Sequence, residues 1–185
     1  MRIISGKNKG KQLVAPTKLP VRPTTDFAKE ALFNILNNHY YFEDLNVLEL
    51  FAGTGNISYE FASRGCSAVL AIDNHSGCVQ FIQKTARELE YPITAIKADA
   101  IEYLKRTYQQ FDLIFADPPY DLPQEKFEAI VQSVFDRQLL ADGGMLVIEH
   151  SSRTDLSELP YFYQEKRYGG TVFSFFEEGE ETVEE

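Results

Sequence analysis

Short apolar runs alternate with longer amphipathic stretches between positions 46 and 149, which is typical of strands and helices wound into a mainly parallel sheet. The apolar runs predict strands at 47–50, 68–72, 93–97, 113–116 and 145–149. The amphipathic stretches between them predict helices at about 57–64, 77–90, 100–108 and 124–139. The expected fold class is therefore α/β, and ligands are expected beyond the carboxyl ends of the strands.

Both ends of the chain predict smaller elements. Near the carboxyl end, segments 161–168 and 171–176 flank a Gly-Gly pair that adopts positive φ easily and closes an antiparallel hairpin. At the amino end, apolar residues 3–5 and 12–14 surround a basic loop, which predicts a small β-hairpin.

A helix is predicted between the N-terminal hairpin and the first strand. After the proline-rich connection at 16–23, Thr24, Thr25 or Asp26 caps a helix that runs to Asn38. Its apolar stripe at helical spacing is formed by Phe27, Ala31, Leu32 and Ile35.

A chain of 185 residues is long enough for one hydrophobic core and short for two. We expect a basic N-terminal hairpin and linker at 1–22, a catalytic domain at 23–176 and an acidic, disordered tail at 177–185. No run of 18 apolar residues and no secretory signal is present, so the protein is expected in the cytoplasm and away from membranes.

No metal site is expected from the cysteines and histidines. Cys66 and Cys78 have no partners at metal-ligand spacing and are interpreted as buried thiols in a reducing compartment. The three histidines show no catalytic grouping and are interpreted as packing or surface residues: His39, His75 and His150.

The formal charge of -10 is divided unevenly along the chain. Residues 1–30 hold seven Lys or Arg against two acids, a net +5, which leaves -15 for the remainder. Only this first segment offers a concentrated positive surface for phosphates, although the same lysines would also serve simply to solubilise a loop.

Residues that follow the first three core strands predict a nucleoside-containing cofactor. Gly53 and Gly55 lie between a strand and a helix, where missing side chains let the backbone approach a ligand. Asp73, after the next strand, is placed to accept both hydroxyls of a ribose. Asp99 is placed to accept an adenine amine, and the Ala100 amide to donate to a ring nitrogen.

The charge of this loop favours S-adenosylmethionine over a dinucleotide. Ser58 stands where the dinucleotide fingerprint needs a third glycine, and no phosphate-binding lysine follows. Glu49 would repel a pyrophosphate and attract the ammonium and sulfonium of S-adenosylmethionine. The predicted cofactor residues are Glu49, Phe51, Gly53, Gly55, Asp73, Asn74, Asp99 and Ala100.

The run Asp117-Pro118-Pro119-Tyr120, after the fourth strand, suits methyl transfer to a planar amine. The Asp117 carboxylate and the Pro118 carbonyl provide two acceptors for the two amine hydrogens. Consecutive prolines fix φ and aim that carbonyl, and Tyr120 provides a face on which a base stacks. The predicted catalytic residues are Asp117, Pro118 and Tyr120.

The whole chain resembles the RsmD family of bacterial 16S rRNA guanine-N2 methyltransferases. The family-specific part is its N-terminal pattern, here 2–6, 10–11, 22–26 and 30–34, read as RIISG, GK, RPTTD and EALFN. The motifs FAGTG and DPPY and the late Gly-Gly hairpin complete the resemblance, whereas Ser5 in place of a frequent glycine and the acidic tail depart from it.

The resemblance implies a Rossmann-like class I S-adenosylmethionine-dependent methyltransferase fold, with a seven-stranded mainly parallel sheet. It also implies that the target is guanine 966 of 16S rRNA, in the small subunit or its assembly intermediate. The residues expected to contact this RNA are Arg2, Lys7, Lys9, Lys11, Arg22, Thr24 and Thr25.

Three other functions remain open at this point. The motif DPPY serves adenine N6 in DNA or RNA equally well, although a DNA enzyme usually carries a recognition domain for which this chain has no room. A protein-glutamine amide methyltransferase leaves the basic N-terminal segment unexplained. A non-catalytic S-adenosylmethionine-binding RNA module would not need Asp117 or Tyr120.

Overall fold

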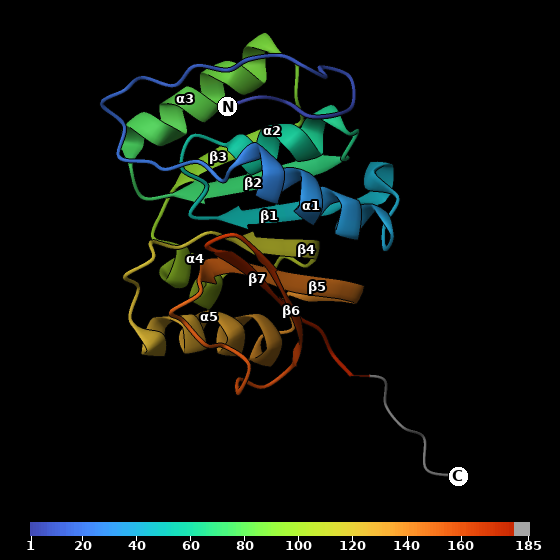
Figure 1. The fold of residues 1–185 in the computed structure, drawn as a ribbon, viewed down its shortest axis with the longest axis vertical. Coiled ribbons are helices and arrows are strands. Elements are labelled where there is room, and N and C mark those ends of the chain that lie inside the picture. The colour runs from blue at the N-terminus through green and yellow to red at the C-terminus, as the bar shows by residue number, and fades with distance from the viewer. Residues whose placement is uncertain (180–185) are drawn as a thin grey trace.

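A computed structural model describes residues 1–179, and the acidic tail predicted at 177–185 lies largely outside them. The chain forms a seven-stranded sheet of order β3-β2-β1-β4-β5-β7-β6 (Figure 1). The bounds are β1 Asn46–Leu50, β2 Ala68–Asp73, β3 Ile93–Lys97, β4 Phe111–Ala116, β5 Leu140–Ser151, β6 Phe162–Tyr168 and β7 Thr171–Phe176. The first five strands are parallel, and β7 pairs antiparallel with both β5 and β6. The predicted mainly parallel sheet with an antiparallel C-terminal hairpin is confirmed.

The helices cover both faces of the sheet because alternate strand residues are apolar on both sides. Their bounds are α1 Asp26–Asn37, η1 Phe42–Asp44, α2 Asn56–Ser63, α3 Ser76–Glu88, α4 Ala100–Arg106 and α5 Gln124–Asp136. Helices α4 and α5 pack on the face that carries Leu48, Ile114 and Ile148. Helices α1, α2 and α3 cover the opposite face. Among residues 1–179, no helix is both long and apolar enough to cross a membrane.

Helix α1 begins where the sequence predicted, but its buried face differs. Thr25 is the N-cap and accepts a hydrogen bond from the Ala28 amide, and the helix ends at Asn37. The predicted apolar stripe is wrong at Phe27, which is 68% exposed. The buried residues of this helix are Ala28, Lys29, Leu32, Phe33 and Leu36. The prediction failed because a lysine on the buried face looks like a solvent-facing position in the sequence.

The N-terminal hairpin is reduced to one antiparallel bridge between Arg2 and Gln12. It packs onto α2 instead of standing apart. The Ile4 amide donates to Glu60 at 2.8 Å, and the Lys7 amide donates to the Ser63 carbonyl at 2.7 Å. This contact is close, because a Cβ on Gly6 would lie 1.9 Å from the Ser63 carbonyl oxygen. Residues 1–22 therefore pack against the main domain.

Candidate active site

The strand order reverses between β1 and β4, so the segments after these two strands lie side by side at the carboxyl edge of the sheet (Figure 1). Register pairs Leu50 with Ala116, and the Asp117 amide donates to the Leu50 carbonyl at 3.3 Å. The glycine loop and the DPPY segment, which are far apart in the sequence, are thereby brought together at one crevice.

The glycine loop after β1 has an unusual backbone. Phe51, Gly53 and Gly55 all have positive φ, at 56°, 57° and 87°. Gly55 is the N-cap of α2, and a Cβ there would lie 2.7 Å from the ring of Tyr59. A side chain at Gly55 is therefore excluded by both backbone strain and packing. The loop thus places the N-terminus of α2 at the carboxyl edge of β1, where the backbone can approach a ligand.

The predicted ribose acceptor is held rigidly by the backbone. Asp73 accepts the Gly53 amide through Oδ2 at 2.8 Å and the His75 amide through Oδ1 at 2.9 Å. Each carboxylate oxygen keeps a further lone pair for a ligand hydroxyl. The neighbouring Asn74 side chain is exposed. The geometry thus brings Gly53, Gly55 and Asp73 together as the sequence predicted.

Asp99 and Ala100 lie one strand further along the same edge. Asp99 is the N-cap of α4 and accepts the Glu102 amide at 2.9 Å. It also lines a hollow of about 520 Å³ between the end of β3 and α4. Capping uses one carboxylate oxygen, and the other has no hydrogen-bond donor within residues 1–179.

The linker at 16–23 crosses the glycine loop, which the sequence did not predict. A Cβ on Gly53 would lie 3.2 Å from Cγ1 of Val21, and one on Gly77 would lie 2.9 Å from Cδ2 of Leu19. Leu19 is buried by this contact. The linker therefore forms one wall of the crevice, directly beside the predicted cofactor residues.

Three carboxyl groups meet on the α1 side of the sheet, at the ends of β1, β4 and β5. Glu49 and Glu149 are each 2% exposed, and Asp117 is half-buried. Ser58 donates its hydroxyl hydrogen to Glu49, and Thr24 donates to Oε2 of Glu149 at 2.7 Å. No Lys or Arg of the described chain forms an ion pair with any of the three.

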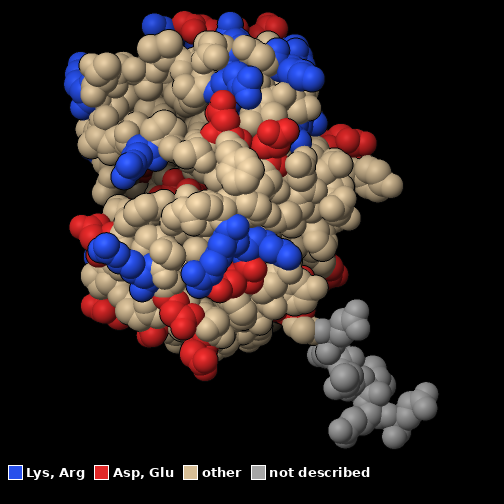
Figure 2. All heavy atoms as spheres, in the orientation of Figure 1, with Lys and Arg blue, Asp and Glu red and all other residues tan. Residues whose placement is uncertain are grey.

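Burial without a counter-ion raises the pKa of all three groups. Burial raises the pKa of Glu49 to about 8 and that of Glu149 to about 7. The pKa of Asp117 is raised well above its ordinary value by burial and then by the neighbouring Glu149 and Glu49 carboxyls. The site therefore favours a ligand that brings positive charge or hydrogen-bond donors. Figure 2 shows a hollow on the left of this face with acidic atoms at its floor and a basic side chain at its rim.

The DPPY segment leaves its aromatic ring accessible. Pro118 is buried, whereas Tyr120 is 47% exposed, and its hydroxyl lies 3.5 Å from Oγ1 of Thr171 on the C-terminal hairpin. The Asp117 carboxylate receives no hydrogen bond from residues 1–179. The segment thus combines a free carboxylate, a fixed backbone carbonyl and an exposed ring.

Known proteins are similar to this chain over most of its length. Residues 1–177 match the model of the family described as Conserved hypothetical protein 95. The chain belongs to this family. YlbH of Bacillus subtilis is 34% identical over 163 residues, which are 85% of this chain and 86% of YlbH. The Escherichia coli protein named Ribosomal RNA small subunit methyltransferase D is 26% identical over 181 residues, 96% of this chain and 89% of that protein.

A solved structure extends the likeness to the fold. The Escherichia coli protein yhhF superimposes with a TM-score of 0.83 at 27% identity, covering 95% of this chain and 96% of yhhF. The resemblance to the RsmD family is thus confirmed, and the fold is that of a class I methyltransferase.

The basic N-terminal segment of this family member is divided into surface and core residues. Lys7, Lys9, Lys11 and Arg22 are exposed, and Arg2 is half-exposed beside Asp26 at 3.2 Å. Figure 2 shows basic side chains over the upper part of this face, where the N-terminal segment and α3 run in Figure 1, and further basic side chains across its lower half.

Three other residues of that segment are engaged within the protein. Lys29, counted in the basic charge, is 1% exposed and pairs with Glu60 at 3.5 Å. Thr24 is buried against Glu149, and Thr25 caps α1. The Thr24 and Thr25 hydroxyls therefore form internal hydrogen bonds.

Sequence reasoning did not select Glu149 or Lys29. Glu149 lies near the carboxyl end of β5 as Glu49 does in β1, so an acid near the carboxyl end of a buried strand was the available signal. Lys29 had no such signal, because its partner Glu60 lies on another helix.

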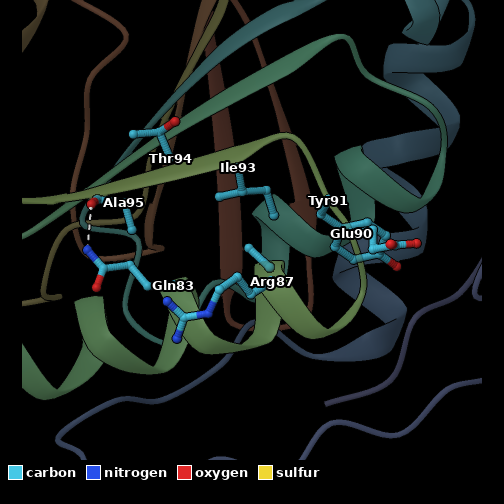
Figure 3. A pocket seen from close by; sticks show the side chains of 8 residues that line it. Gln83, Arg87, Glu90, Tyr91, Ile93, Thr94 and Ala95 are labelled. Atoms are coloured by element: carbon cyan, nitrogen blue, oxygen red, sulfur yellow. Dashed lines mark hydrogen bonds between the residues drawn. The ribbon is translucent and has the colours of Figure 1, made fainter.

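Two further predictions concern residues away from the crevice. Cys66 and Cys78 are buried and free, as expected, and burial raises the pKa of the Cys66 thiol to about 12. His150 is buried and lies 2.7 Å from Oγ of Ser174 through Nε2, which fits a packing role. A groove of about 490 Å³ between α3 and β3, in which Gln83 donates to the Ala95 carbonyl, contains none of the predicted residues (Figure 3).

Proposed function

We propose that the protein transfers a methyl group from S-adenosylmethionine to the exocyclic N2 amine of a guanine in 16S rRNA. The observation that carries the proposal is the Asp117 carboxylate beside the glycine loop, with Glu49 at its side and no ion-pair partner for either within residues 1–179. The rRNA methyltransferase name of the Escherichia coli relative supports the substrate class. The family resemblance points to guanine 966, and to the cytoplasm as the location of the reaction.

The residues at the carboxyl edge of the sheet fit the parts of this cofactor. Glu49 would hold the ammonium, Asp73 the ribose hydroxyls, and Asp99 with Ala100 the adenine. Val21 and Leu19 supply an apolar wall next to the glycine loop. When bound, S-adenosylmethionine supplies a methyl carbon made electrophilic by the adjacent sulfonium. A buried carboxyl such as Glu49 ionises when a cation arrives, so charge complementarity develops on binding.

Asp117 and Pro118 act on the acceptor amine. Its lone pair is delocalised into the base, and two acceptors that hold its two hydrogens direct the lone pair away from the ring plane. The amine would then accept the methyl group that S-adenosylmethionine supplies, which leaves the sulfur as a neutral thioether, and would lose one proton. Asp117, whose pKa is raised by burial, is suited to receive that proton. Tyr120 offers its exposed ring for stacking.

The guanine has to leave its stack to reach Asp117, and backbone contacts must offset that unstacking. The exposed Lys7, Lys9, Lys11 and Arg22 provide the positive surface for these contacts, in either the small subunit or its assembly intermediate.

A methyl-transfer assay on small subunits from cells that lack the protein tests the proposal. Tritiated S-adenosylmethionine is the donor, and mass mapping identifies the product nucleotide. We expect one N2-methylguanine, formed about 10² to 10³ times more slowly by the Asp117→Ala variant. A product of N6-methyladenine would establish the adenine alternative, and cofactor binding without any transfer would establish a non-catalytic module.

A further inference from the structure

Glu149 stands next to Asp117 on the same side of the sheet. Strands β4 and β5 are parallel and in register at Ala116 and Ile148, so the following pair is Asp117 and Glu149. Phe115 and Val147, two positions before Asp117 and Glu149, both face the α1 side of the sheet. Residues two apart in a strand point to the same face. Because neighbouring strands lie about 4.8 Å apart, the two carboxyl groups are adjacent and point to one side.

The Glu149 carboxyl is fixed but only partly satisfied. Thr24 donates to Oε2 at 2.7 Å, and no residue of the described chain donates to Oε1. Thr24 is held in turn, because the Asn56 amide donates to its carbonyl at 3.1 Å and Lys29 donates to Oδ1 of Asn56 at 2.9 Å. Oε1 has no donor in the described chain and is not fully buried, so it is open to a ligand that brings a hydrogen-bond donor.

Two adjacent acceptors complement guanine and not adenine. In guanine the N2 amine is flanked by N1–H, so two neighbouring ring-edge groups donate hydrogen bonds. In adenine the amine is flanked by N1, which accepts. A carboxylate placed against that N1 would meet another acceptor, and a buried site with such a mismatch rejects the ligand.

We propose that Glu149 determines the choice of guanine by accepting its N1–H while Asp117 and the Pro118 carbonyl hold the amine. This role rests on the proposed function. Thr24 is a positioning residue that orients the Glu149 carboxyl. Burial raises the pKa of Glu149 to about 7, and a hydrogen bond from N1–H would stabilise its ionised form.

The test separates the N1–H from the amine by using 2-aminopurine, which keeps the amine but has an acceptor at N1. Small subunits are reconstituted from 16S rRNA in which the methylated nucleotide is guanine or 2-aminopurine, introduced by splinted ligation. The kcat/KM of each substrate is measured for the wild type, for Glu149→Gln and for the exposed control Glu158→Gln. Binding of S-adenosylmethionine is titrated in parallel to show that each variant is folded.

We expect the wild type and Glu158→Gln to prefer guanine by about 10²-fold, the size of a lost hydrogen bond to a charged group with a new acceptor clash. Glu149→Gln should reduce that preference to less than about tenfold, because an amide both accepts from N1–H and donates to N1.

Two results would overturn this role. The first is a wild type that methylates 2-aminopurine as well as guanine, which needs no variant. The second is a Glu149→Gln protein that keeps the wild-type preference. Failure of the wild type to methylate guanine at all would instead contradict the proposed function, so the two failures are distinguishable.

Discussion

Two groups of buried charges lie on the same side of the sheet and differ in one respect. In the first, Lys29 pairs with Glu60 at 3.5 Å, and Arg64 pairs with the same Glu60 at 2.9 Å. In the second, Glu49, Asp117 and Glu149 have no ion-pair partner in residues 1–179. Buried charges that are paired hold the N-terminal segment on α2, whereas buried charges that are unpaired remain available to a ligand.

The two groups are connected through Asn56 and Thr24. Lys29 donates to Asn56, Asn56 donates to the Thr24 carbonyl, and the Thr24 hydroxyl donates to Glu149. The basic segment that we propose for RNA binding is therefore held by the same hydrogen-bond chain that orients a carboxyl of the crevice.

The largest effect is expected from Asp117, which belongs to the unpaired carboxyls of the crevice. Asp117→Ala should lower methyl transfer by about 10² to 10³, because the amine loses an aligned acceptor. Its unfolding free energy should stay within about 1 kcal/mol of the wild type, since no internal partner is lost. Tyr120→Phe should keep most of the activity. If Asp117→Ala methylated the ribosomal substrate at the wild-type rate, the proposed mechanism would be contradicted.

Replacing Lys29 tests the paired buried charges, which are Lys29, Glu60 and Arg64. Lys29→Met should lower the free energy of unfolding by about 3 kcal/mol in urea titrations, because Glu60 stays buried with one partner fewer. The exposed Lys126→Met is the matched control and should change little. Combining Lys29→Met with Glu60→Gln should be less destabilising than the sum of the two. Equal stabilities for Lys29→Met and Lys126→Met would show that the pair is dispensable.

Replacing Glu49 should raise the free energy of unfolding, whereas replacing Lys29 should lower it. Its pKa in the folded protein, about 8, exceeds its ordinary value, so the wild type loses stability as the pH rises from about 4.5 to about 8. Glu49→Gln lacks this loss. Without ligand, the variant should gain about 1 to 3 kcal/mol relative to the wild type between pH 5 and pH 8. An equal pH dependence in both proteins would contradict the burial of an ionisable, unpaired carboxyl.

The smallest effect is expected from the exposed lysines. Deleting residues 1–20 would also remove buried Ile3, Leu13 and Leu19, so charge substitutions are the cleaner test. Lys7→Gln with Lys9→Gln should leave S-adenosylmethionine binding unchanged and reduce the salt slope of RNA affinity by about 1 to 2. Lys105→Gln with Lys126→Gln is the matched control. Identical salt slopes for the two double variants would argue against an RNA surface at the N-terminus.

The apolar pattern predicted the five parallel strands in their chain order because most of these runs are buried between layers of helices, although β3 at the sheet edge is largely exposed. It missed the first part of β5, since Ala141-Asp142-Gly143-Gly144 reads as a turn although the strand extends from Leu140. The glycine loop and DPPY were predictable because their residues follow strand ends directly. The Lys29–Glu60 pair was not, because it depends on the packing of two helices.

Calorimetry of S-adenosylmethionine binding at pH 7, in buffers of different ionisation enthalpy, tests the unpaired carboxyls most directly. Glu49, with a pKa of about 8, is largely protonated in the free protein at this pH. A bound ammonium lowers that pKa, so binding should release close to one proton, and Glu49→Gln should abolish most of the release and weaken binding. Binding without proton release, or with the same release and affinity in Glu49→Gln, would contradict the account.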